Sequence, residues 1–290
     1  MSINNSNSSG EPDMKYGINL QSILPVRISP DETGEQVTQL LFGEIFKVIE
    51  TIPGRHKIEN YADDYVGWVD AKMINFLSED EYTAISNGCP HSVYSSFAKI
   101  RSTESHEVMY LTKGSWLHFF DKEKKRFGIG NRTYECLEGE FLLPSENPNP
   151  LIQTAKSFLN VPYLWGGKNI FGIDCSGFVQ IVFGLHGLSL PRDAKDQFEK
   201  GEFVLFPNVK EGDLAFFEND EGKIVHVGII MNKNQIIHAS GKVKTDTLDA
   251  FGIYSSDFQK YTHTLAGIKR IWKNGSPVPN YCWGKTGRMS

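Results

Sequence analysis

Cys175 is the residue whose type and setting point most directly to chemistry. It lies in the run Asp174-Cys175-Ser176-Gly177-Phe178, where Asp174 suits a helix N-cap because its carboxylate accepts a hydrogen bond from the first turn. Cys175 would then be the first helical residue, where unsatisfied N–H groups and the helix dipole favour a negative charge. Because the thiolate is the nucleophilic form of cysteine, we predict a catalytic nucleophile. The alternative is a small buried apolar residue at a helix start.

Two histidines supply the base that such a thiol needs. His226 lies on the alternating segment 224–231, and His238 lies on the segment that follows. If residues 232–234 form a hairpin loop, His238 pairs opposite Gly228 and becomes a same-face neighbour of His226, ~7–8 Å away at Cα. One imidazole would take the thiol proton while the other holds its ring in the right tautomer. The alternative is two core histidines that hydrogen-bond to backbone.

The other histidines lack such a context and are expected at the surface or in loops. They are His56, His91, His106, His118, His186 and His263. We therefore assign no chemical role to these six side chains.

The elements around the candidate residues predict an α+β domain. Residues 151–159 have apolar positions at helical spacing, and a second helical pattern begins at Asp174. Strands are expected afterwards, at residues 213–217, 224–231, 235–239 and 265–272. Helices followed by strands are typical of α+β folds.

Two β-rich modules precede that domain. Short apolar strands broken by glycines run through residues 16–77, and segment 81–144 repeats this theme with a period of roughly 70 residues. Such spacing indicates small β barrels rather than βαβ units, and the prolines of segment 144–150 are typical of a linker. We divide the chain into a disordered tail (1–14), a first barrel (15–78), a second barrel (79–146) and a C-terminal domain (147–290).

Composition excludes several function classes. The 290 residues carry 30 Lys and Arg against 35 Asp and Glu, a net charge of −5 without a basic run. Neither nucleic acid nor an anionic membrane is therefore an expected partner. No apolar stretch approaches the ~18 residues of a membrane-spanning helix, and the N-terminus has no signal-peptide pattern. A cytoplasmic location is the expectation, although a processed secreted or periplasmic form would look the same.

The cysteines stand far apart and form no Cys-x-x-Cys pair. They are Cys89, Cys136, Cys175 and Cys282. Neither a disulfide framework nor a zinc knuckle is expected, and reduced thiols are the default for a cytosolic chain. A zinc site built from Cys175, His226 and His238 is the remaining metal alternative, but no ligand-spacing motif supports it. We expect no metal and no cofactor.

Six short motifs give the C-terminal region a family resemblance. In chain order they are Pro162-Tyr163-x-Trp165-Gly166-Gly167, Asp174-Cys175-Ser176-Gly177-Phe178, Leu190-Pro191-Arg192-Asp193, Gly212-Asp213-Leu214, His226-Val227-Gly228-Ile229 and Ile237-His238-Ala239. Through them, residues 150–272 resemble the NlpC-like cysteine peptidases, papain-like enzymes that cleave cell-wall peptides next to γ-linked D-glutamate. The resemblance implies that Cys175 is the nucleophile, His226 the base and His238 the orienting third member.

The same resemblance implies groups that stabilise the reaction's oxyanion. The backbone N–H of Cys175 and the hydroxyl of Tyr163 are the candidates, a role that suits rigid donors aimed at the developing charge. Asp174 and Ser176, in the motif of the nucleophile, complete the predicted substrate-binding set on this side.

With two SH3-like modules in front, the chain resembles the γ-D-glutamyl-L-diamino-acid endopeptidases, also called dipeptidyl-peptidase VI. In that family the first barrel closes one end of the groove, which limits access to peptides with a free N-terminal L-Ala. The resemblance implies acidic and aromatic groups around the ammonium, and the candidates are Glu35, Tyr65, Trp165 and Asp193. An acetylated N-terminus would leave buried charges unpaired at a cost of ~2–5 kcal/mol. Ala194 departs from the pattern, because several relatives carry a hydroxyl residue there.

The resulting interpretation is an α+β protein in which a papain-like NlpC-type catalytic domain follows two small SH3-like β barrels. We expect a monomer that acts on a murein peptide such as L-Ala-γ-D-Glu-diamino acid, in cell-wall peptide recycling or turnover. The main alternative is a non-catalytic wall-peptide-binding protein that uses its SH3-like modules. The presence of both Cys175 and His226 favours the enzyme. A related acyltransferase or lipid-modifying enzyme would need a membrane-seeking segment, and none is visible.

Overall fold

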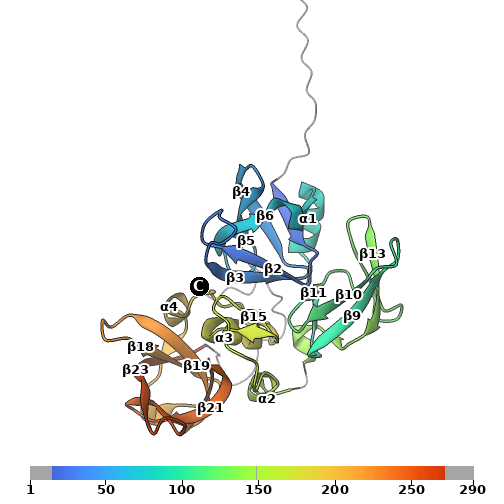
Figure 1. Cartoon of the computed structure of the whole chain (residues 1–290). Coiled ribbons are helices and arrows are strands. Elements are labelled where there is room, and N and C mark those ends of the chain that lie inside the picture. The colour runs from blue at the N-terminus through green and yellow to red at the C-terminus, as the bar shows by residue number, and fades with distance from the viewer. Residues whose placement is uncertain (1–14, 148, 272–290) are drawn as a thin grey trace, which may run out of the picture.

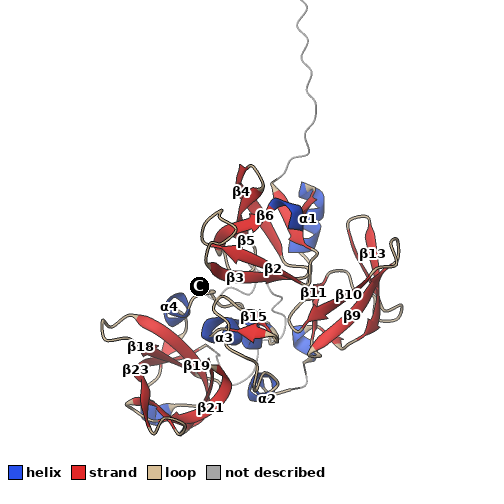
Figure 2. Ribbon diagram, in the orientation of Figure 1, coloured by secondary structure: helices blue, strands red, loops and turns tan. Residues whose placement is uncertain are grey.

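The computed structural model describes residues 15–147 and 149–271, so the predicted tail (1–14) lies outside the described residues. Figure 1 shows a first barrel (blue), a second β-rich region (green) and a C-terminal sheet (orange to red). Helix α3 (Cys175–Gly184) lies between the first barrel and that sheet, and Figure 2 shows how few helices accompany the strands. Within the described part of the chain, no helix is long and apolar enough to cross a membrane.

The first barrel is an antiparallel sheet of seven strands in the order β3-β2-β6-β5-β4-β1-β7. Its elements are β1 (Tyr16–Asn19), β2 (Ile23–Arg27), β3 (Gln36–Leu41), β4 (Ile45–Ile52), β5 (Arg55–Asn60), β6 (Val66–Asp70), the 3₁₀ turn η1 (Ala71–Met73) and β7 (Ile74–Leu77). Burial alternates along β2 and β5, so every second side chain faces inward, including Leu24 and Ile58. The predicted strands in this region are confirmed, and together they enclose a small core around Leu24, Phe46 and Ile58.

The second region has two smaller antiparallel sheets, with the orders β10-β9-β13-β12 and β11-β8-β14. Its strands are β8 (His91–Val93), β9 (Phe97–Ser102), β10 (Val108–Thr112), β11 (Trp116–Leu117), β12 (Arg126–Ile129), β13 (Arg132–Glu138) and β14 (Phe141–Leu142). Strand β11 ends at Leu117, and two residues later Phe119 adopts a left-handed conformation with a φ of 55°.

Helix α1 (Glu79–Ser86) connects the two barrel regions and was not predicted. Ser78 caps it, and the side chain of Glu81 reaches back to the Ser78 N–H to complete a capping box. Tyr82 stacks on Tyr16 of β1, with ring centroids 4.2 Å apart. The helix therefore packs against the first barrel.

The C-terminal domain places short helices before a seven-stranded antiparallel sheet, as predicted for an α+β domain. The helices are α2 (Leu151–Lys156), α3 (Cys175–Gly184) and α4 (Ala194–Phe198), with a 3₁₀ turn on either side, η2 (Pro144–Glu146) and η3 (Phe206–Asn208). The strands are β15 (Lys168–Asn169), β16 (Gly172–Ile173), β17 (Glu202–Phe203), β18 (Leu214–Glu218), β19 (Ile224–Asn232), β20 (Gln235–Ser240), β21 (Lys242–Leu248), β22 (Gly252–Ser255) and β23 (Lys260–Arg270). All of α3 is buried, and it packs on β19 and β20.

The large sheet runs in the order β17-β23-β18-β19-β20-β21-β22, and β22 also pairs with β23. That second pairing closes most of the sheet on itself, so residues far apart in the sequence meet on one face. β15 and β16 form a separate pair directly before α3.

The expectation of surface or loop positions is wrong in part for several histidines. His56 is buried within β5, whereas His118 and His186 lie in turns, as expected, but are buried rather than at the surface. Each has a polar partner that compensates for burial. These partners are the Thr51 hydroxyl for His56, the Gly43 carbonyl for His118 and the Thr154 hydroxyl for His186. His263 is also misassigned, and it belongs to the candidate site described below.

The expectation of reduced thiols is also wrong for one cysteine, because Cys89 is disulfide-bonded. Cys136 and Cys175 are free and buried. Cys282 lies outside the described residues.

Candidate active site

Cys175 occupies the first position of α3, where the sequence places it. The Asp174 side chain accepts a hydrogen bond from the Gly177 N–H at 2.7 Å, which confirms the predicted N-cap. The thiol is 5% exposed, and its sulfur accepts hydrogen bonds from the backbone N–H groups of Val227 and Ser176. Val227 follows His226 in β19, so this contact brings the sulfur to the strand that carries His226.

The electrostatic setting of this thiol differs from the expectation based on the helix start alone. Burial, followed by the carboxylate of Asp174, raises the pKa of the Cys175 thiol to about 12, although Val227 and Arg192 act in the opposite direction. The resting thiol is therefore neutral. Any reaction in which this sulfur attacked a substrate would need a base to remove the thiol proton.

His226 and His238 form the imidazole pair that the hairpin argument predicts. Gly228 pairs with His238 across β19 and β20, as predicted, and Nε2 of His226 lies 2.8 Å from Nδ1 of His238. Glycine at 228 leaves room for this pair, because a Cβ there would lie 2.8 Å from the Cβ of His238. Burial and the neighbouring imidazoles of His238 and His263 hold the pKa of His226 well below its ordinary value. The His226 imidazole is therefore neutral near pH 7.

The sequence reasoning missed two residues next to this pair. Oδ2 of Asp246 lies 3.1 Å from Nε2 of His238, and the His263 ring lies over His226 with centroids 4.3 Å apart. Asp246 could have been found by extending the strand pairing from β20 to β21. Asp246 of β21 pairs with Ile236 of β20 and so lies diagonally beside His238. His263 comes from the distant strand β23 and has no local signal. Within the described residues, no group of three or more His, Cys, Asp or Glu side chains is arranged to hold a metal ion.

The four candidates for the substrate ammonium meet as two pairs at the junction of the first barrel and the C-terminal domain. Trp165 Nε1 donates to Oε1 of Glu35 at 2.6 Å, and the Tyr65 hydroxyl donates to the Asp193 carboxylate. Glu35 is exposed, so the cost expected for a buried unpaired carboxylate does not apply to it. Trp165, at 59% exposed, leaves most of its ring open to a ligand.

Arg192 connects these pairs to the helix start, and sequence reasoning assigned it no role. Its guanidinium is almost fully buried, and Nη2 lies 2.5 Å from Oδ2 of Asp174. Nε donates to the hydroxyl of Thr38 in the first barrel at 2.7 Å. Asp174 also accepts from the Gly166 N–H at 2.9 Å, next to Trp165. One buried ion pair thus joins the barrel, the loop of Trp165 and the N-terminus of α3.

The remaining predicted residues have more varied settings. The Ser176 hydroxyl accepts from Arg192 Nη1 at 2.9 Å, so it supports the ion pair, and Ala194 is buried at the first position of α4. Tyr163 interacts electrostatically with the Cys175 thiol. Burial and this neighbour raise the pKa of Tyr163, so its hydroxyl remains a hydrogen-bond donor.

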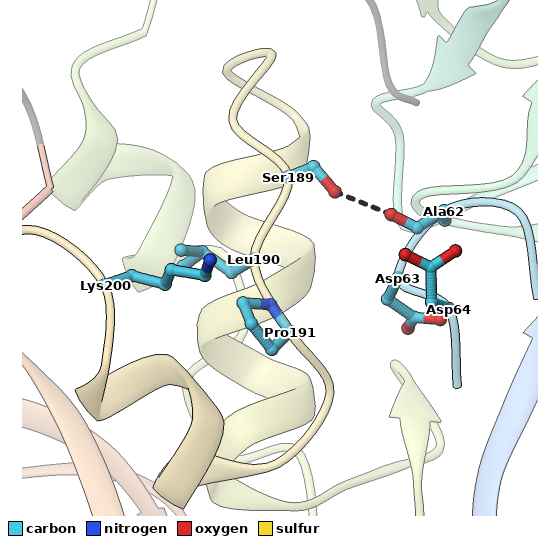
Figure 3. A pocket seen from close by; sticks show the side chains of 7 residues that line it. All are labelled: Ala62, Asp63, Asp64, Ser189, Leu190, Pro191 and Lys200. Atoms are coloured by element: carbon cyan, nitrogen blue, oxygen red, sulfur yellow. Dashed lines mark hydrogen bonds between the residues drawn. The ribbon is translucent and has the colours of Figure 1, made fainter. Parts of the chain in front are cut away.

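A small cavity of about 180 Å³ opens at the same junction (Figure 3). Ser189 bridges its two sides by donating to the Ala62 carbonyl at 2.8 Å. Its lining residues come from both regions and are Ala62, Asp63, Asp64, Ser189, Leu190, Pro191 and Lys200. None of the four candidates for the substrate ammonium lines this cavity.

Comparison with known proteins identifies the domains. Residues 160–264 match the NlpC/P60 family and residues 26–74 match the bacterial dipeptidyl-peptidase SH3 domain. A protein of Bacillus cereus named gamma-D-glutamyl-L-lysine dipeptidyl-peptidase is 38% identical over 222 residues, covering 70% of this chain and 66% of that protein. A protein of the same name from Bacillus subtilis is 47% identical over 91 residues, 31% of each chain. The chain thus spans less than two thirds of the length of these two relatives.

A solved structure supports the fold over most of the chain. The crystal structure of an NlpC/P60 family protein from Bacillus cereus superposes with a TM-score of 0.74 at 21% identity, covering 88% of this chain and 99% of that one. The α+β architecture with an N-terminal SH3-like barrel is therefore confirmed. This chain carries an NlpC/P60 domain behind a bacterial dipeptidyl-peptidase SH3 domain.

Proposed function

We propose that this protein is a cysteine peptidase that hydrolyses the γ-D-glutamyl–diamino-acid bond of murein peptides with a free N-terminal L-Ala. The observation that carries the proposal is the 2.8 Å contact of the His226 and His238 imidazoles where β19 meets the start of α3, with Cys175 at that start. The names of the Bacillus relatives support the same bond class. Free peptides released during cell-wall turnover or recycling would supply such substrates.

The first half of the reaction forms a thioester. His226 accepts the thiol proton of Cys175 while the sulfur attacks the γ-carbonyl carbon of D-glutamate. The backbone N–H of Cys175 and the Tyr163 hydroxyl donate to the oxygen that gains charge. The imidazolium of His226 then returns the proton to the amine of the diamino acid as the C–N bond breaks.

The second half regenerates the enzyme. His226, neutral again, takes a proton from a water molecule that attacks the thioester carbon. The C–S bond breaks, the proton goes to the sulfur, and L-Ala-γ-D-glutamate leaves. His238 keeps the ring of His226 in one orientation through both steps.

Recognition of the free N-terminus is assigned to the junction with the first barrel. The ammonium of L-Ala would be met by the carboxylates of Glu35 and Asp193 and by the open face of Trp165. Because the whole chain has a net charge of −5, attraction of an acidic peptide cannot be global and must come from local groups.

The test is incubation with L-Ala-γ-D-Glu-L-Lys, its meso-diaminopimelate counterpart and their N-acetylated twins, followed by mass spectrometry. We expect release of L-Ala-γ-D-Glu from the free peptides and none from the acetylated ones. Cys175→Ala and His226→Ala should each abolish release. Cys136→Ala, which removes the other free cysteine among the described residues, from the core of the second region, is the matched control and should retain turnover.

Two outcomes would overturn the proposal. Substantial release by Cys175→Ala would remove the sulfur from the mechanism. Binding of the peptides by the wild-type protein without any cleavage would favour the non-catalytic wall-peptide-binding alternative.

A further inference from the structure

The Asp246 carboxylate is buried and lies next to the imidazole pair. Only 3% of its side chain is exposed, and its Oδ2 lies 3.1 Å from Nε2 of His238. His238 in turn meets His226 through its other ring nitrogen, Nδ1, at 2.8 Å. The contacts form one line from Asp246 through His238 to His226.

The donor and acceptor properties of these groups admit one arrangement of protons. An ionised carboxylate only accepts hydrogen bonds, so the Nε2 of His238 that faces Asp246 must carry hydrogen. In a neutral imidazole the other nitrogen is then an acceptor, so Nδ1 of His238 must receive a hydrogen bond from Nε2–H of His226. The Nδ1 of His226 is left with its lone pair, which is the form that a base for a thiol requires.

We propose that Asp246 is a positioning residue that fixes the tautomers of both histidines, so that the lone pair of His226 resides on Nδ1. The role rests on the proposed function, because it matters only if His226 takes the proton of Cys175. When that proton arrives, His226 becomes a cation whose Nε2–H still points at His238. Asp246 then stabilises the cation through the intervening ring.

The charged groups around Asp246 keep the carboxylate ionised. Lys244 of the same strand places Nζ 3.0 Å from the same Oδ2, and Asp257 lies 3.5 Å from that ammonium. Burial works against ionisation, but hydrogen bonds from His238 and Lys244 hold the pKa of Asp246 below its ordinary value. The remaining titratable neighbour is His263, whose pKa burial lowers to about 4, so it is neutral near pH 7.

The first experiment needs no variant. A long-range ¹H–¹⁵N correlation spectrum of the wild-type histidine rings near neutral pH reports which nitrogen of each ring carries hydrogen. We expect Nε2–H on both His226 and His238. A His238 ring protonated on Nδ1 alone would overturn the proposal, whether or not any variant folds.

The second experiment measures turnover. Asp246→Ala removes the acceptor and should lower kcat by about 10–100-fold while KM stays within about twofold. Asp246→Asn keeps an acceptor oxygen without the charge, so its kcat should lie between those of the wild type and Asp246→Ala. The control is Asp257→Asn, which alters a carboxylate 71% exposed that meets Lys244 but no imidazole, and it should retain the wild-type kcat.

The outcomes separate this inference from the proposed function. If folded Asp246→Ala retained kcat within twofold, with Nε2–H still on His238, Asp246 would have no positioning role. If the wild-type protein cleaved no murein peptide, the proposed function would fail, and the ring spectrum would still decide whether Asp246 sets the tautomers.

Discussion

The two barrel regions contact α3 at different places and by different chemistry, and the first barrel also reaches the middle of the helix, where Asp63 accepts a hydrogen bond from Gln180. At the N-terminal end, Thr38 of the first barrel binds Arg192, which pairs with the cap residue Asp174. At the C-terminal end, the Tyr94 hydroxyl of the second region donates to the Leu185 carbonyl. The ends are far apart, because a helix of 10 residues is about 15 Å long.

The contacts of the first barrel are buried and charged. Nζ of Lys168 lies 2.7 Å from Oε1 of Glu44, with side chains 1% and 2% exposed. The second region makes a weaker polar contact, since Nζ of Lys113 donates to the neutral Ser157 hydroxyl at 3.2 Å. We infer that the first barrel is part of the site, whereas the second region supports the far end of its main helix.

The largest expected effect is on stability. Lys168→Met leaves Glu44 buried without its cation and should lower the free energy of unfolding by about 3–5 kcal/mol. Lys113→Met, the matched substitution in the second region, removes one hydrogen bond to a neutral group and should cost about 1 kcal/mol. Chemical denaturation of the two variants measures both values, and equal losses would contradict the distinction between the regions.

A smaller effect is expected on acid stability, where the two barrels meet. His118 of the second region donates to the Gly43 carbonyl of the first barrel at 2.7 Å, and burial lowers the pKa of His118 to about 4. Because the unfolded state protonates first, stability is complete above about pH 6.5 and falls as the pH drops toward 4.

His118→Gln retains a donor and removes the titration. Between pH 7 and pH 4, the free energy of unfolding of the variant should therefore fall by about 2–3 kcal/mol less than that of the wild type. Denaturation at both pH values tests this, and parallel losses in the two proteins would show that His118 does not carry the acid sensitivity.

The smallest effect is expected on substrate binding. Glu35→Gln should raise KM for free-amine peptides by about 3–10-fold with little change in kcat, because the carboxylate is exposed and screened by solvent. Glu138→Gln alters a carboxylate of the second region, 63% exposed and paired with Lys99, and should leave KM unchanged. Steady-state kinetics would contradict the assignment if both variants behaved alike.

Contacts between residues close together in the sequence could be predicted, whereas contacts between distant residues could not. The cap at Asp174 and the pairing of Gly228 with His238 follow from local alternation and one hairpin, and both were predictable. The contact of His263 with His226 depends on closure of a sheet across a long stretch of chain.

Contacts between domains are even harder to predict from the sequence. The pairs Arg192–Thr38 and Lys168–Glu44 join side chains with no periodic signal, because each partner is buried only after the barrel has docked. The raised pKa of Cys175 was unpredictable for the same reason, since burial by the assembled fold outweighs the helix start.

Alkylation by iodoacetamide tests the central claim, that the Cys175 sulfur does the chemistry with His226 as its base. The other free cysteine of the described residues, Cys136, is an internal standard, because it is buried and burial likewise raises the pKa of its thiol to about 12. We predict that Cys175 is alkylated well before Cys136, that residual peptidase activity equals the unmodified fraction of Cys175, and that His226→Ala removes the rate difference. Full activity in protein alkylated at Cys175 would contradict the account.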